Sequence, residues 1–169
     1  MDGMELVADS DEVDDVVDAW RRQRPDLAVE AMEVWSRIHR LSAILDDHRK
    51  RAFAAHGLEL WEFDVLAALR KTGEPFRLSP GQLIRETYVT SGTMTNRIDR
   101  LRARGLVTRK PNPQDKRAAV IELTDSGRKI VDAALTSLLE LENELLEHWQ
   151  PSQTRELATA LRRLLASAE

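Results

Sequence analysis

Basic side chains are concentrated in one segment of an otherwise acidic chain. The 169 residues carry a formal charge of −4, yet residues 91–117 alone sum to +6 and the remainder to −10. Within this segment, the stretch TSGTMTNRIDRLRARGLVTRK contains Arg97, Arg100, Arg102, Arg104, Arg109 and Lys110. Such local asymmetry predicts attraction to a polyanion, which the net charge of the whole chain conceals.

A helix over residues 91–104 would present side chains suited to reading DNA. Met94, Ile98 and Leu101 form its apolar side, and the opposite side is polar. Small residues near the start of such a helix let its backbone approach the major groove, asparagine can pair with adenine, and arginine reaches guanine or phosphate. The predicted DNA contacts, on this helix and on the basic segment after it, are Ser91, Thr93, Thr95, Asn96, Arg100, Lys116 and Arg117.

An arginine-rich helix face is often only a solvated surface, so the DNA interpretation depends on the neighbouring elements. Ser79 followed by Pro80 predicts the start of a short helix. A break near residues 88–90 separates it from the basic helix, which Gly105 ends. Two short helices joined by a tight turn are typical of a helix-turn-helix.

A β-hairpin is predicted directly after the basic helix. The segments LVTRK and AAVIEL are strand-like, and the turn-forming PNPQDKR separates them. In a winged helix, such a hairpin places basic side chains in the narrow minor groove. We expect Arg117 at the tip of the wing, braced by Asp115 through a local ion pair.

The rest of the chain is predicted to be helical. Amphipathic helices are expected from Asp11 to Pro25, over residues 31–56 and 60–71, from Thr124 towards Pro151, and over residues 152–166. Together they predict a fold class that is mostly α with a small β-hairpin wing. The apolar stripes of residues 31–55, 130–149 and 152–166 exceed what one small lobe can bury, which predicts a homodimer.

Several classes of protein are disfavoured by what the sequence lacks. It has no cysteine, no glycine-rich phosphate loop and no nucleophile elbow, and its four histidines lack metal-binding spacing, so we expect no enzyme, no metal and no cofactor. No apolar run is long enough for a membrane span and no signal peptide is evident, so we expect no membrane partner and a cytoplasmic location. A non-sequence-specific architectural DNA binder and a helical interaction protein without DNA binding remain as alternatives.

The order of elements and the hairpin sequence GLVTRKPNPQDKRAAVIELTDSGR resemble the MarR family of dimeric winged-helix transcriptional regulators. The resemblance covers residues 31–169 and rests on the Asp-x-Arg tip at residues 115–117 and the Leu-Thr-x-x-Gly exit at residues 123–127. It implies a DNA-binding lobe over about residues 58–124, dimerisation helices over about 31–56 and 125–167, and a pseudo-palindromic operator. Residues 1–30 form an N-terminal extension with an added helix.

Arg97 is the basic residue that fits the DNA interpretation least. It lies at the edge of the apolar stripe, where an unpaired charge is unfavourable, and Asp64 on the preceding helix is the expected counter-charge. Such a pair can equally be a structural link between helices.

The added first helix resembles the urate-responsive subgroup of the MarR family. In that subgroup a Trp, an Asp and two Arg residues are tied to ligand response, and the matching positions here are Trp20, Asp64, Arg97 and Arg109. The resemblance implies a repressor released from DNA by a small anionic ligand, either urate-like or citrate- or aconitate-like. Taken alone, a residue such as Trp20 is more often a packing residue, and only the joint match of the four residues favours the ligand role.

Overall fold

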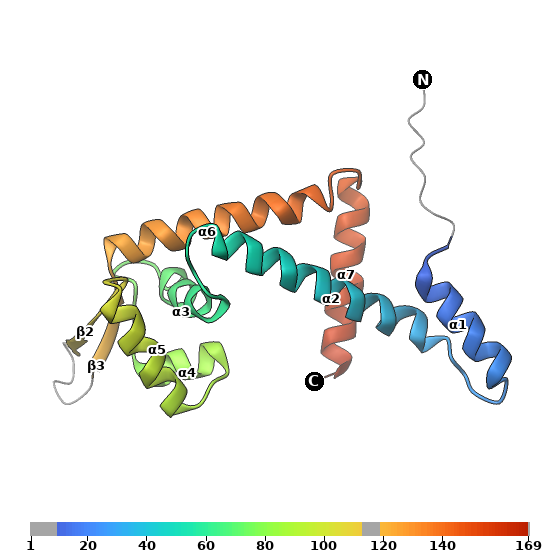
Figure 1. The fold of residues 1–169 in the computed structure, drawn as a ribbon, viewed down its shortest axis with the longest axis horizontal. Helices are drawn as coiled ribbons and strands as arrows, with labels where there is room; N and C mark the ends of the chain where they lie inside the picture. Colours follow the sequence, from blue (N-terminus) through green and yellow to red (C-terminus); the bar gives the residue numbers. More distant parts are fainter. Residues whose placement is uncertain (1–9, 113–118, 169) are drawn as a thin grey trace, which may run out of the picture. The chain divides into compact units, whose positions relative to one another are not determined.

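The computed structural model of the chain describes residues 10–112 and 119–168. Its elements are α1 (Glu12–Gln23), α2 (Ala31–Ala54), α3 (Leu60–Lys71), β1 (Arg77–Leu78), α4 (Pro80–Thr87), α5 (Ser91–Ala103), β2 (Val107–Pro111), β3 (Ala119–Leu123), α6 (Asp125–Glu144) and α7 (Pro151–Ala168) (Figure 1). They form two compact units, residues 1–47 and 48–169, with α2 contributing to both. The mostly helical fold with its small sheet confirms the predicted fold class.

The N-terminal unit begins with a capped helix. The Asp11 carboxylate accepts hydrogen bonds from the backbone N–H groups of Val13, at 2.7 Å, and Asp14, at 3.3 Å. In return the Asp14 carboxylate accepts the N–H of Asp11 at 2.8 Å, which completes a capping box. The helix ends where the N–H of Arg24 donates to the carbonyl of Trp20, directly before Pro25. The predicted boundaries of this helix are therefore confirmed.

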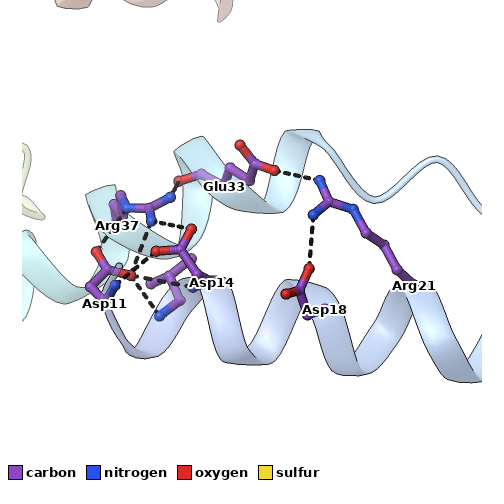
Figure 2. Close-up of polar contacts among 7 residues, drawn as sticks. Asp11, Asp14, Asp18, Arg21, Glu33 and Arg37 are labelled. Atoms are coloured by element: carbon purple, nitrogen blue, oxygen red, sulfur yellow. Dashed lines mark hydrogen bonds and ion pairs between the residues drawn. The ribbon is translucent and has the colours of Figure 1, made fainter. Parts of the chain in front are cut away.

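Arg37 of α2 joins α2 to the cap of α1. Its Nε lies 2.9 Å from Oδ2 of Asp11, and its Nη2 lies 2.9 Å from Oδ1 of Asp14 (Figure 2). The hydrogen bond from Arg37 is the main reason that the pKa of Asp11 lies below its usual value. The pKa of Asp14 is lowered first by the backbone hydrogen bond from Asp11 and then by Arg37.

A second arginine bridges the same two helices further along α1. Arg21 donates to Asp18 of its own helix at 3.0 Å and to Glu33 of α2 at 2.6 Å (Figure 2). The apolar core of this unit is small and consists of Val13, Val17 and Val29, with Met32 packed against it. Ion pairs therefore supplement a limited hydrophobic contact between α1 and α2.

The core of the C-terminal unit surrounds α3. At the end of α2, Phe53 stacks on Phe63 of α3, with ring centroids 3.9 Å apart. The other large, fully buried side chains come from α3, the helix-turn-helix, β3 and α6. They are Leu66, Leu69, Leu83, Met94, Leu101, Ile121, Val65 and Val131. The back of the helix-turn-helix is thus fixed to α3.

The sheet has three antiparallel strands in the order β1-β3-β2. In the hairpin, Val107 pairs with Leu123 and Pro111 with Ala119, which confirms the predicted strands. The two-residue strand β1, where Leu78 pairs with Ile121, was not predicted. Two residues are too few to show an alternating pattern, so this strand is defined only by its pairing with β3.

The sheet joins α6 through a close backbone approach. The Thr124 hydroxyl donates to the carbonyls of Gly105 and Leu106, at 2.8 and 3.0 Å, and accepts the N–H of Gly127 at 3.0 Å. A Cβ on Gly127 would lie 2.1 Å from the carbonyl oxygen of Leu106. Thr124 therefore caps α6 as predicted, and Gly127 lies at a position that cannot accept a larger residue.

The long C-terminal stripe does not belong to one continuous helix. α6 ends at Glu144, and residues 145–149 form turns in which Leu146 donates to Asn143 and Trp149 to Leu146. The prediction of a helix continuing towards Pro151 was wrong here. Pro151 is instead the first residue of α7, a position that proline favours.

The last helix has an uncovered apolar side. None of the residues of α7 is buried, and Leu157, Leu161 and Leu165 are exposed along one side. Neither α7 nor any other helix within residues 10–112 and 119–168 is long and apolar enough to cross a membrane.

Candidate nucleic-acid interface and ligand pocket

The helix-turn-helix is formed by two capped helices. The Ser79 hydroxyl accepts the N–H of Gln82 at 3.2 Å at the start of α4, as predicted. Tyr88 ends α4 in the left-handed region, with φ of 52°, and is 95% exposed. Thr90 caps α5 by accepting the N–H of Thr93 at 3.4 Å. The tight turn between the helices therefore depends on a left-handed residue followed by an N-cap.

The two sides of α5 are those expected from its sequence. Met94, Ile98 and Leu101 are buried against the core. The predicted DNA contacts on the helix are all exposed and are Ser91, Thr93, Thr95, Asn96 and Arg100. The Thr95 hydroxyl donates to the carbonyl of Ser91 at 3.1 Å, so its oxygen can still accept a hydrogen bond.

Most basic residues on or next to α5 already have an acidic partner. Arg102 pairs with Asp99 at 3.1 Å, within the same helix. The other three pairs reach residues outside the segment 91–117 and are Arg100 with Glu59 at 2.7 Å, Arg104 with Glu62 at 2.5 Å, and Lys110 with Glu122 at 2.6 Å. The local charge of +6 therefore overstates the positive charge available to a polyanion.

Arg104 is a structural residue rather than a candidate DNA contact. Its partner Glu62 is only 2% exposed and is the one buried charged residue among those described. Arg104 also donates to the carbonyl of Gly57 at 2.9 Å. These bonds fix the end of α5 to the start of α3. No local sequence signal indicates this pair, because Glu62 precedes Arg104 by 42 positions.

Trp61 lies under two arginines of α5. The guanidinium carbon of Arg100 is 4.7 Å from the Trp61 ring centroid, and that of Arg97 is 5.4 Å away. Nε1 of Trp61 donates to Oε2 of Glu59 at 2.7 Å. The pKa of Glu59 is lowered by this hydrogen bond and, to a smaller extent, by Arg100. Sequence reasoning did not identify Trp61 or Glu59.

The expected ion pair between Asp64 and Arg97 is not formed in the described part of the chain. Asp64 instead pairs with Arg49 of α2 at 3.0 Å. Arg97 is half-buried and lies over Trp61, because the face of an indole ring stabilises a guanidinium without a carboxylate. The prediction that Asp64 is the counter-charge of Arg97 was therefore wrong, and an aromatic ring lies against the Arg97 guanidinium instead.

Arg109 and Trp20, the other two residues that match the urate-responsive subgroup, belong to different compact units. Arg109 is exposed in the middle of β2, where its Cα pairs with Ile121. Trp20 belongs to the N-terminal unit and is 47% exposed. Asp115, Lys116 and Arg117 lie outside the described residues, so the predicted wing tip has no structural description.

A cavity of about 500 Å³ lies beside Asp64. It is bordered by α3, the end of α4 and α6, through Phe63, Asp64, Tyr88, Asp132 and Leu135 among others. Two ion pairs line it, Arg70 with Asp132 at 2.8 Å and Lys71 with Glu86 at 3.3 Å. Within the described ranges, no group of three or more His, Asp or Glu residues could hold a metal ion.

The MarR family model matches residues 56–118, which include α3, the helix-turn-helix and β2. The transcriptional regulator PecS of Dickeya dadantii is 36% identical over 158 residues, which cover 94% of this chain and 93% of PecS. The chain belongs to the MarR family.

Solved MarR structures share the fold. Sco3205, a MarR family regulator of Streptomyces coelicolor solved in complex with DNA, has a TM-score of 0.70 and 22% identity, covering 85% of this chain and 94% of its own. BpsR of Bordetella bronchiseptica, whose DNA binding is regulated by 6-hydroxynicotinic acid, has a TM-score of 0.61 and 23% identity, covering 75% and 89%. In this MarR protein, α4 and α5 form the helix-turn-helix, and β2 and β3 form the wing.

MarR regulators bind DNA, form dimers and bind small-molecule ligands. The relatives of this MarR protein are transcriptional regulators rather than enzymes.

Proposed function

We propose that this MarR protein is a homodimeric repressor that binds a pseudo-palindromic operator and is released from it by a small anionic ligand. The observation that carries the proposal is the division of α5 into a buried side and an exposed side. Met94, Ile98 and Leu101 fix the helix to the core, while Asn96 and the small residues near its start face outwards. This arrangement suits a recognition helix in the major groove.

Dimerisation is supported by the apolar surface of the terminal helices. Exposed large side chains include Val34, Trp35 and Leu41 on α2, Leu145 and Trp149 in the turns after α6, and Leu157 and Leu161 on α7. Monomeric proteins rarely expose so much apolar area. A two-fold dimer would place two helices α5 on half-sites about one helical turn apart.

The proposed ligand is anionic because two arginines, Arg97 and Arg109, belong to the four residues that match the urate-responsive subgroup. The cavity beside Asp64 supports a ligand-binding role for that residue, since it also holds Arg70 and Lys71. An incoming anion would compete with Asp132 for the guanidinium of Arg70 and with Glu86 for the ammonium of Lys71. Trp20, Arg97 and Arg109 stay in the proposal on the resemblance alone. Urate-like and citrate- or aconitate-like ligands both fit it.

DNA selection tests the first half of the proposal. Binding of the purified protein to a random duplex library should enrich a two-fold symmetric site, and the affinity should fall steeply with salt. Asn96→Ala should relax the base preference, whereas Arg117→Ala should weaken all DNA binding and flatten the salt dependence. Enrichment of no sequence would favour an architectural DNA binder, and absence of DNA binding would favour an interaction protein.

Thermal-shift measurements with urate, xanthine, citrate and aconitate test the second half. A ligand that stabilises the protein should also release it from the selected operator, because only unequal binding to the free and DNA-bound states shifts the affinity. Asp64→Asn should reduce this release while the protein still binds DNA. Asp26→Asn is a matched control, since it removes the same charge from another exposed arginine pair, with Arg24 at 2.7 Å. Equal release from both variants would exclude Asp64 from the response.

A further inference from the structure

Glu59 forms an ion pair with Arg100, one of the predicted DNA contacts. Its Oε1 accepts a hydrogen bond from Nη2 of Arg100 at 2.7 Å, and its Oε2 accepts one from Nε1 of Trp61 at 2.7 Å. The guanidinium carbon of Arg100 lies 4.7 Å from the ring centroid of Trp61. The Arg100 side chain is therefore held between a carboxylate and an aromatic ring.

The carboxylate of Glu59 accepts a hydrogen bond from the Arg100 guanidinium, which is the group that would also donate to DNA. Arginine binds carboxylates, phosphates and guanine through the N–H groups of its guanidinium. The side chains of Arg100 and Glu59 are 54% and 57% exposed, so water weakens their attraction and DNA acceptors can reach the pair. Arg100 can thus exchange one acceptor for another.

Trp61 does not need Glu59 to keep the arginines of α5 in place. Arg97 lies over the same ring, at 5.4 Å, and the side of α5 beneath it is buried through Ile98 and Leu101. Glu59 is also the N-cap residue of α3, where its backbone N–H donates to Oε2 of Glu62 at 3.0 Å. Glutamine keeps this backbone bond and a side-chain oxygen at the cap, so Glu59→Gln should leave the fold unchanged.

We propose that Glu59 competes with DNA for Arg100 and so lowers the affinity of this MarR protein for DNA. The inference rests on the proposed role of α5 as a recognition helix. When Arg100 binds DNA, Glu59 loses its partner and stays near the phosphates as a repelling charge. This cost is the same whether Arg100 leaves Glu59 for a guanine or for a phosphate. Glu59 therefore weakens binding to every DNA sequence in which Arg100 takes a DNA acceptor.

Glu59→Gln tests this competition, because glutamine keeps the shape and removes the charge. Affinities are measured for the duplex selected by the wild-type protein and for an unrelated duplex of equal length, at several salt concentrations. The variant should bind the selected duplex about twofold to fivefold more tightly, the range expected for losing one exposed ion pair. Binding to the unrelated duplex should tighten by no more than this, because Arg100 gains no more there, and the salt slope should steepen by about 1. The melting temperature should not change.

Two controls separate the mechanism from a general charge effect. Asp26→Asn removes one negative charge and one exposed arginine pair from the N-terminal unit, and its DNA affinity should equal that of the wild type. In an Arg100→Ala background, Glu59→Gln should give no further gain. A gain that persists without Arg100 would overturn the competition, since Glu59 would then act only through repulsion.

The failure of the inference and the failure of the proposed function give different results. A wild-type protein that enriches no DNA sequence contradicts the proposed function, and the inference with it. Selective wild-type binding together with unchanged or weaker binding by Glu59→Gln contradicts the inference alone.

Discussion

Arg104, directly after α5, pairs with the buried carboxylate of Glu62. Among the arginines on or next to α5, it is therefore the one that contributes most to the stability of the fold. Glu62 receives one backbone hydrogen bond, from Glu59, and one ion pair, from Arg104 at 2.5 Å. A buried carboxylate that loses its cation keeps the unfavourable free energy of desolvation. Exposed pairs contribute much less, because both ions stay hydrated.

Arg104→Ala should therefore lower the free energy of unfolding by about 2–3 kcal/mol, because Glu62 keeps only its backbone partner. Arg102→Ala removes a neighbouring arginine whose partner, Asp99, is exposed, and it should change stability by less than about 0.5 kcal/mol. Urea denaturation of the two variants measures the difference. Equal losses would show that burial of Glu62 has no energetic weight.

The sequence predicted which residues lie on the outer side of α5, but not what its arginines contact. Helical periodicity gives the direction of a side chain and says nothing about the helix packed against it. For that reason Asp64 was expected beside Arg97, where Trp61 lies instead. Glu59 and Glu62 precede their partners Arg100 and Arg104 by 41 and 42 positions, and these pairs become visible only when α3 is packed against α5.

Among the elements, those with strong local signals were predictable. Ser79 and Thr124 mark helix starts through their hydroxyl caps, and Gly105, with φ of 70°, ends α5. The hairpin strands followed from their alternation and the turn between them. β1 and the end of α6 were missed because pairing with β3 and the turns before Pro151 decide them.

Gly127 lies where α6 approaches the sheet, and a larger side chain is not tolerated at this position. A Cβ there would lie 2.1 Å from the Leu106 carbonyl oxygen and 2.8 Å from Cδ1 of Leu123, so Gly127→Ala must push the sheet away from α6. We expect it to destabilise the protein by about 3 kcal/mol, as overpacking of a core does. Gly92→Ala in α5 is the control, because its Cβ would meet no atom within 4 Å. A similar melting temperature for both variants would contradict the close approach.

The contact between α1 and α2 should weaken at low pH. The lowered pKa values of Asp11 and Asp14 mean that their ionised forms stabilise the folded unit above the ordinary aspartate pKa of about 3.9, and this stabilisation is lost as the pH falls through the lowered values. NMR of the α1 amides between pH 7 and 2 should show the helix loosening in that window. In Arg37→Met the contact should be weaker at pH 7 and its acid dependence smaller. An unchanged titration in this variant would exclude Arg37 as the cause.

On the scale of the whole molecule, the exposed apolar side of α7 requires a partner surface. Leu161→Glu places a charge in the middle of this side and should convert the proposed dimer to monomer at micromolar concentration, because a desolvated charge would be unpaired. Operator affinity should fall with it, since one half-site binds alone. Thr159→Glu adds the same charge on the opposite side of the helix and should leave the dimer intact. Sedimentation measures both, and a wild-type monomer would contradict the proposal.

β3 continues into α6 through the single residue Thr124, so a rotation of α6 also moves the wing. Thr124 bonds Gly105, Leu106 and Gly127 at once, so no flexible residue separates the wing from the 20 residues of α6. A helix of that length extends about 30 Å, so a rotation of about 5° at its far end moves the wing by about 2.6 Å. Small angular changes among the C-terminal helices are therefore amplified at the wing and alter the spacing of half-sites that a dimer can span.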